Sequence, residues 1–189
     1  MAIRTFLALD LDEPIRRGLT DAAKEFPADG SKIRWVAPEN LHVTAKFLGD
    51  VADGAVAEVC AAVREAAGGI APFPFDVAGL RCVPPGRKMR MIWADAHDSS
   101  GEIIELFGAL EGALEPLGFP RERREPRPHI TLARIKFTRN ADGLNAVARR
   151  YAPTTFGTQR AGEVVVYQSQ LTPQGAVYTP MARQALGPA

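Results

Sequence analysis

The two halves of the chain repeat one order of secondary structure, and this repeat constrains the fold more than any other feature of the sequence. Alternation of apolar and polar residues predicts strands over residues 2–10, 41–48, 73–80, 91–96, 129–135 and 162–170. Apolar stripes at helical spacing predict helices between Asp12 and Pro27, around 54–67, between Ser99 and Gly118, and around 141–151. Each half therefore reads strand, helix, strand, helix, strand.

The registers of the two halves also agree. The interval from Phe6 to His42 differs by one residue from the interval from Ile92 to His129. A repeat of strands and helices joined by short connections predicts an α+β fold with two related lobes. No segment of linker composition separates the halves, so we expect residues 1–189 to form a single domain of two lobes.

A His-x-Thr motif lies at the matching place in each half, as His42-Val43-Thr44 and His129-Ile130-Thr131. The chain has three histidines and ten threonines in 189 residues, so chance rarely produces two such motifs. Residues i and i+2 of a strand project to one face. Each His therefore lies beside its Thr, and the apolar residue between them suits the core. Pairing the halves about a pseudo-two-fold axis would bring both motifs into one cleft.

Two imidazoles and two hydroxyls suit the hydrolysis of a phosphodiester. One imidazole removes a proton from water and the other protonates the leaving alkoxide, and each transfer supplies about 10²–10⁴-fold. An imidazole pKa near 6.5 lets one ring be neutral while the other is charged. The hydroxyls of Thr44 and Thr131 can donate hydrogen bonds to non-bridging oxygens as charge develops. The near symmetry of the halves leaves open which histidine is the acid.

Composition narrows the possible partners and cofactors. Two cysteines and three histidines form no group with metal-ligand spacing, so we expect no metal and no other cofactor. No apolar stretch has the length of a membrane span, and the first residues resemble a strand rather than a signal peptide. We therefore expect a cytoplasmic protein with no membrane contact. Nothing in the sequence indicates an obligate protein partner.

The residues around both motifs resemble the two-histidine phosphoesterases. The matching segments run from Leu41 to Gly49 and from Arg127 to Arg134, together with Arg4–Asp10, Arg34–Val36 and Val166–Pro173. Within that superfamily the chain is similar to bacterial and archaeal RNA 2′,3′-cyclic phosphodiesterases, also described as 2′–5′ RNA ligases. The resemblance implies a bilobal α+β fold, with antiparallel sheets around a central cleft. It also implies hydrolysis of a terminal 2′,3′-cyclic phosphate to a 2′-phosphomonoester, with RNA ends or nucleoside 2′,3′-cyclic phosphates as substrates.

The resemblance also assigns roles to single residues. It makes His42 the proton donor, His129 the proton acceptor and Arg134 a phosphate contact. Strict alternation puts Arg134 on the face opposite His129, so a bulge or a strand end would have to redirect it. Alternation instead puts Lys46 beside His42 and Thr44, as a second candidate for substrate binding or as a solvated lysine.

Several residues keep two interpretations. The basic residues Arg121, Arg123, Arg124 and Arg127, and a second cluster of Arg87, Lys88 and Arg90, form either solvated loops or a rim that attracts anions. Trp35 and Phe47 can stack on a base, although each is more often part of a core. We expect Tyr167 and Tyr178 to be structural, and His97, which has no Thr at +2, to be non-catalytic.

Three other functions stay open from the residues alone. One site can run the reverse 2′–5′ ligation, and the same motifs suit hydrolysis of another cyclic or 2′–5′-linked nucleotide. A non-catalytic module that binds RNA ends is an alternative of another class. The four intact motif residues argue against it, because pure binding needs no acid–base pair.

Overall fold

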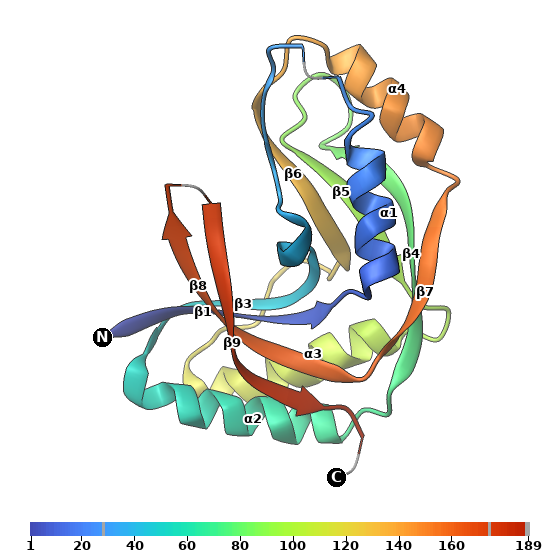
Figure 1. Cartoon of the computed structure of the whole chain (residues 1–189). Helices are drawn as coiled ribbons and strands as arrows, with labels where there is room; N and C mark the ends of the chain where they lie inside the picture. Colours follow the sequence, from blue (N-terminus) through green and yellow to red (C-terminus); the bar gives the residue numbers. More distant parts are fainter. Residues whose placement is uncertain (28, 174, 188–189) are drawn as a thin grey trace.

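The computed structural model describes residues 1–27, 29–173 and 175–187 (Figure 1). The strands are β1 (Ala2–Asp10), β2 (Lys32–Trp35), β3 (His42–Ala52), β4 (Phe73–Val83), β5 (Met91–His97), β6 (His129–Phe137), β7 (Thr155–Ala161), β8 (Glu163–Thr172) and β9 (Gly175–Ala185). The α-helices are α1 (Glu13–Ala23), α2 (Val56–Gly68), α3 (Glu102–Leu114) and α4 (Ala141–Tyr151). Short 3-10 turns cover Pro38–Asn40 (η1), Asp53–Ala55 (η2) and Glu115–Leu117 (η3).

All strands belong to one antiparallel sheet in the order β7-β4-β5-β6-β3-β1-β8-β9, and β2 pairs with β6 beside this path. Counted outward from the centre, the strands on the two sides correspond in pairs: β6 with β3, β5 with β1, β4 with β8, and β7 with β9. The sheet is therefore pseudo-two-fold symmetric about its centre. At that centre β3 and β6 are joined by the single pair Val43 and Ile130.

This narrow junction divides the sheet into two lobes whose strands run in clearly different directions (Figure 1). The first lobe comprises β1, β3, β8 and β9 and is covered by α2 and α3, which pack on each other. The second lobe comprises β2 and β4 to β7 and carries α1 and α4. The α+β fold with two pseudo-symmetric lobes that we expected is confirmed.

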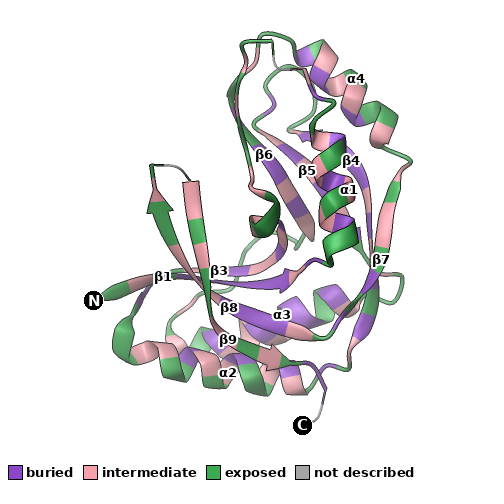
Figure 2. Ribbon diagram, viewed as in Figure 1, coloured by how far each residue is buried: buried purple, intermediate pink, exposed green. Residues whose placement is uncertain are grey.

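The helices form where the sequence supplies local signals. In α1, Pro14 occupies the first turn and the apolar stripe Ile15, Leu19 and Ala22 is buried. In α4, the side chain of Asn140 accepts a hydrogen bond from the backbone N–H of Gly143, which caps the helix. The buried residues gather between each half-sheet and its helices (Figure 2).

The halves of the sequence do not correspond to the lobes. Strand β4 from the first half pairs with β5 in the second lobe, and β8 from the second half pairs with β1 in the first lobe. Helix α1 contacts β7 of the second lobe, and α3 contacts β3 of the first. Each lobe therefore needs elements from both halves.

Three strands are absent from the sequence-based expectation, namely β2, β7 and β9. Two of them, β7 and β9, form the outer edges of the sheet, and β2 pairs only with β6. Edge strands lose the clean alternation of buried and exposed residues, and Pro180 within β9 argues against a strand in a sequence. No helix in the described part of the chain is long and apolar enough to span a membrane.

Candidate active site

The two His-x-Thr motifs lie side by side at the junction of the lobes. Strands β3 and β6 pair at Val43 and Ile130, whose side chains are buried, so the motif residues on either side of this pair lie on the opposite face. The two imidazoles are near enough for His129 to lower the pKa of His42. This arrangement brings both histidines and both threonines to one face, as the sequence predicted.

Each imidazole is oriented by a carbonyl two residues before it. His42 Nδ1 donates to the carbonyl of Asn40 at 2.7 Å, and His129 Nδ1 donates to that of Arg127 at 2.6 Å. A ring that donates from Nδ1 has Nε2 available for proton transfer. His42 Nε2 lies 2.9 Å from the Thr44 hydroxyl, which donates to it when the ring is neutral.

Aromatic rings hold both imidazoles in place. His42 packs against Phe6 at 5.0 Å between ring centroids and meets the edge of Tyr178 at 5.5 Å. His129 stacks on Trp93 at 3.8 Å. The Trp93 indole N–H is buried with no hydrogen-bond partner among the described residues. Among the described residues, two aromatic rings contact His42 and one contacts His129, so the two halves differ in this packing.

Burial lowers the pKa of both histidines from the ordinary value of 6.5. The hydrogen bonds to Asn40 and Arg127 act in the opposite direction, because a carbonyl acceptor favours the protonated ring. His129 also lowers the pKa of His42, because a positive charge on one ring disfavours a positive charge on the other.

An aspartate lies directly opposite each histidine on the neighbouring strand. Asp10 pairs with His42 in the register of β1 and β3, and Asp95 pairs with His129 in that of β5 and β6. Each carboxylate forms an ion pair with an arginine, Asp10 with Arg183 at 3.1 Å and Asp95 with Arg81. Asp10 and Asp95 each raise the pKa of the histidine they face.

The sequence analysis did not identify these aspartates as site residues, although the repeat contains a pattern that could have indicated them. Asp10 and Asp95 occupy equivalent places in the strands that precede the two helices of the repeat. Tyr167, which we expected to be structural, donates its hydroxyl proton to Asp10 at 2.7 Å. Together with Tyr178 it lines a hollow of about 170 Å³ beside His42, so both tyrosines belong to the site.

The expected position of Lys46 beside His42 and Thr44 is wrong. Successive residues Leu7 and Ala8 of β1 pair with Lys46 and Thr44, so Ala45 is an unpaired bulge residue. The bulge turns Lys46 to the helix-covered face, where its side chain is buried and its Nζ donates to Glu111 of α3. Lys46 therefore cannot contact a substrate in the cleft.

The equivalent bulge in β6 has the opposite consequence for Arg134. Successive residues Ile92 and Trp93 of β5 pair with Ala133 and Thr131, so Leu132 is the bulge residue. Arg134 consequently shares the face of Thr131 and is exposed. Burial raises the pKa of Tyr178, and the charge of Arg134 acts against that rise. The same charge adds to the lowering of the pKa of His129, which lies on the other lobe. We expected Arg134 to reach a phosphate only if a bulge redirected its side chain, and β6 contains such a bulge at Leu132.

The remaining candidates lie outside the motif face or at its margin. His97 is at the exposed end of β5, with Nε2 4.0 Å from Asp76. The four arginines of the 121–127 segment are exposed, and Arg121 is paired with Glu115. Phe47 lies on the motif face, 5.9 Å from Phe6, and is exposed.

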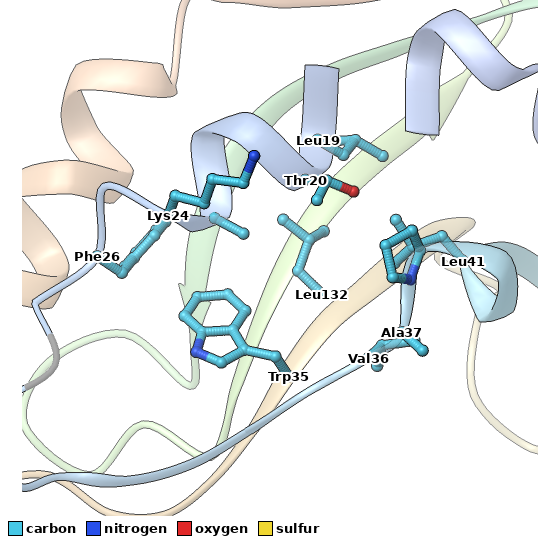
Figure 3. A pocket seen from close by; sticks show the side chains of 11 residues that line it. Leu19, Thr20, Lys24, Phe26, Trp35, Val36, Ala37, Leu41 and Leu132 are labelled. Atoms are coloured by element: carbon cyan, nitrogen blue, oxygen red, sulfur yellow. The ribbon is translucent and has the colours of Figure 1, made fainter. Parts of the chain in front are cut away.

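A larger cavity of about 480 Å³ lies elsewhere, between α1 and the segment that leads to His42 (Figure 3). Trp35, Phe26, Leu19 and Leu132 line it, and Lys24 is the one charged side chain among its described lining residues. The described lining therefore offers no pair of titrating groups that could exchange protons with a substrate. Within residues 1–27, 29–173 and 175–187 no group of three or more His, Cys, Asp or Glu side chains is placed to hold a metal ion.

A two-lobed antiparallel sheet with a His-x-Thr motif on each central strand defines the chain as a two-histidine phosphoesterase. The sequence model of the LigT-like phosphoesterase family matches residues 9–93 and 96–178, and the chain belongs to that family. The resemblance seen in the sequence is thereby confirmed.

Individual relatives match nearly the whole chain. The protein named RNA 2′,3′-cyclic phosphodiesterase of Methanothermobacter thermautotrophicus is 34% identical, over 96% of this chain and 97% of its own. The crystal structure of TT0787 of Thermus thermophilus superposes with a TM-score of 0.82 and 27% identity, covering 98% of this chain and 99% of that chain. LigT of E. coli complexed with 3′-AMP gives a TM-score of 0.79 and 26% identity, covering 98% of this chain and 99% of that chain.

Proposed function

We propose that this protein hydrolyses 2′,3′-cyclic phosphodiester ends of RNA to 2′-phosphomonoesters. The observation that carries the proposal is that His42 and His129 flank the Val43–Ile130 junction on the same face, each with Nδ1 donating to a carbonyl. Nε2 of each ring is left for proton exchange, and that of His42 lies 2.9 Å from the Thr44 hydroxyl. Relatives named RNA 2′,3′-cyclic phosphodiesterase support the choice of substrate. A cytoplasmic location, expected from the sequence, is part of the same proposal.

The reaction needs one proton removed and one supplied. A neutral His129 takes a proton from water through Nε2 as the water oxygen forms a bond to phosphorus. A protonated His42 donates its Nε2 proton to the 3′ oxygen as the bond from phosphorus to that oxygen breaks. The phosphate stays on the 2′ oxygen, and the two histidines exchange protons with solvent to return to their initial states. Burial lowers the pKa of His42, and the hydrogen bond to the carbonyl of Asn40 acts against that shift, toward the charged form that this role requires.

The threonines and Arg134 would act on the non-bridging oxygens. Thr44 and Thr131 lie beside the two histidines on the same face, and each can donate one hydroxyl hydrogen bond. Arg134 supplies a positive charge next to them. Charge that accumulates on phosphate oxygens in the transition state is stabilised by such donors, and one donor is worth up to about 10²–10³-fold.

A product analysis tests the proposal. The protein is incubated with an oligoribonucleotide that ends in a 2′,3′-cyclic phosphate, with EDTA present, and the end group is identified by mass spectrometry and chromatography. We expect a 2′-phosphate and full activity in chelator. A 3′-phosphate product, or loss of turnover that a divalent cation restores, would contradict the mechanism. RNA fragments with a cyclic end and a 5′-hydroxyl test the reverse ligation in the same assay.

A further inference from the structure

Strands β2 and β6 carry a row of basic side chains that begins beside the motif face. Beyond the bulge at Leu132, β6 continues with Arg134, and β2 contributes Lys32 and Arg34, which lie two residues apart and share a face. Lys136 follows on β6 as the unpaired residue between Ile135 and Phe137, which pair with Ile33 and Lys32. All four basic residues are exposed. Arg34 pairs directly with Arg134 in the antiparallel register. Residues that face each other in such a pair project to one side of the sheet, so the two guanidinium groups share a face.

The row leads out of the catalytic centre. Arg134 follows Thr131 on the motif face, and its charge acts on both His129 and Tyr178. From His129 to Lys136 the strand extends on the order of 20 Å. This length is enough to accompany a few nucleotides of an extended strand. Figure 1 shows β6 running away from the junction of the lobes along the second lobe.

The charges of this row are not balanced by the protein itself. Neither β2 nor β6 contains an acidic residue, and none of the four basic residues forms an ion pair with any described part of the chain. Like charges directly opposite each other in a sheet are destabilising. Violations of such local rules are concentrated where function requires them. The 121–127 segment differs, because Glu122 and Glu125 are interspersed among its arginines and Arg121 is paired with Glu115.

We propose that Lys32, Arg34 and Lys136, which continue the row beyond Arg134, bind the phosphodiester backbone of the nucleotides that precede the cyclic end, so that an oligonucleotide binds more tightly than a mononucleotide. This inference rests on the proposed function. The reacting phosphate is at the 3′ end of the RNA and lies at the histidines, so the strand runs in its 5′ direction along β6 toward Lys136. Basic side chains that neutralise phosphates give affinity that falls with salt.

Kinetics with two substrates of different length test the inference. Arg34→Gln and Lys32→Gln/Arg34→Gln are compared with Arg64→Gln, a variant of equal charge to the first, whose exposed arginine lies on α2 of the other lobe. For a ten-nucleotide RNA with a cyclic end, Arg34→Gln should raise KM about tenfold and leave kcat unchanged. Hydrolysis of a nucleoside 2′,3′-cyclic phosphate should not change in any of the three variants.

The salt dependence of oligonucleotide affinity gives a second measurement, which does not depend on turnover. Fluorescence anisotropy measures binding of a labelled oligoribonucleotide with a terminal 2′-phosphate. The slope of log affinity against log salt should become less steep by about 0.7 in Arg34→Gln and by about 1.4 in the double variant. The midpoint of thermal unfolding should stay the same or rise, because one of two opposed like charges is removed.

Three results would overturn the inference. The first is that Arg34→Gln raises KM equally for the long and the short substrate. The second is that Arg34→Gln binds the oligonucleotide with wild-type affinity. The third is that Arg64→Gln raises KM for the long substrate as much as Arg34→Gln does. Tighter binding of a polyglutamate peptide than of the oligonucleotide would assign the row to a protein partner instead. If the variants weaken binding of the oligonucleotide but the wild-type protein hydrolyses neither substrate, the proposed function is wrong and the role of the basic row in binding is supported. If the wild-type protein hydrolyses both substrates and the variants bind the oligonucleotide with wild-type affinity, the proposed function stands and the proposed role of the basic row is wrong.

Discussion

At the scale of single residues, the two histidines are held alike and a third histidine is not. His42 and His129 donate from Nδ1 to a carbonyl two residues before them, and each is stacked or packed on an aromatic ring. His97 has neither feature, and its side chain is 60% exposed. It is therefore a matched control for substitutions of the other two.

We expect His42→Ala and His129→Ala each to lower kcat by about 10²–10⁴-fold, because each removes one proton transfer. The double variant should be little worse than either single variant, since the two groups act as a unit. His97→Ala should keep wild-type turnover. Steady-state kinetics on a cyclic substrate measure these rates, and circular dichroism checks the fold. Wild-type rates in either single variant would contradict the acid–base pair.

The aspartates opposite the histidines allow the acid and the base to be told apart. Burial lowers the pKa of both imidazoles, so the maximum of kcat/KM should lie on the acidic side of pH 6.5. Asp10 raises the pKa of His42, and Asp10→Asn should therefore lower that pKa further. If His42 is the acid, the alkaline limb of the profile moves to lower pH, because the proton it must donate is lost earlier.

Asp95→Asn provides the complementary measurement. It should lower the pKa of His129 and move the acidic limb to lower pH, because the base is then neutral at more acidic pH. Asp12→Asn, an exposed residue at the start of α1, serves as control. Movement of the acidic limb in Asp10→Asn and of the alkaline limb in Asp95→Asn would reverse the two roles.

At the scale of secondary-structure elements, a bulge in each motif strand decides which residues reach the cleft. The bulge at Ala45 buries Lys46 against α3, where Lys46 contacts Glu111 and the carbonyl of Pro120 at 2.9 Å. The side chains of Lys46 and Glu111 are 3% and 13% exposed. This ion pair anchors the start of the segment that leads into β6.

We expect Lys46→Met to destabilise the protein by about 3–5 kcal/mol, because it leaves the Glu111 carboxylate buried and unpaired. Lys46→Met/Glu111→Leu should recover most of this loss, since apolar residues of similar size often replace a buried pair without cost. Urea denaturation measures both. The folded double variant should retain KM for the cyclic substrate. A raised KM at unchanged stability would return Lys46 to the substrate site.

At the scale of the whole molecule, the lobes are interlocked. Strands β4 and β8 each leave their own half of the chain and pair in the other lobe. Neither half can complete a lobe by itself, so burial in one lobe depends on the other.

We therefore expect a single cooperative unfolding transition, with equal calorimetric and van't Hoff enthalpies. Fragments 1–86 and 87–189 should be unfolded alone, because each leaves apolar sheet faces uncovered, and should regain activity when coexpressed. Scanning calorimetry and circular dichroism measure this. A stable fold of either fragment, or two separate transitions, would show that the lobes are independent and would contradict the expectation of one domain.

The sequence by itself determined the repeat, the two motifs and most of the central elements. Helix α4 covers Ala141–Tyr151 as expected, and β1 begins at Ala2 and ends at Asp10 as expected. These features depend on short-range periodicity and on residues two positions apart, which a single chain segment encodes completely. The same local rule correctly brought each His beside its Thr.

Only the tertiary structure decided the exchange of β4 and β8, the faces of Lys46 and Arg134, and the carboxylates opposite the histidines. Local alternation placed Lys46 in the cleft and Arg134 outside it, and both placements were reversed by bulges. A bulge is a mismatch between two paired strands, so it arises only when a strand meets a partner distant in the sequence. The pairing of Asp10 with His42 depends on the same long-range register, which no pattern within either strand contains.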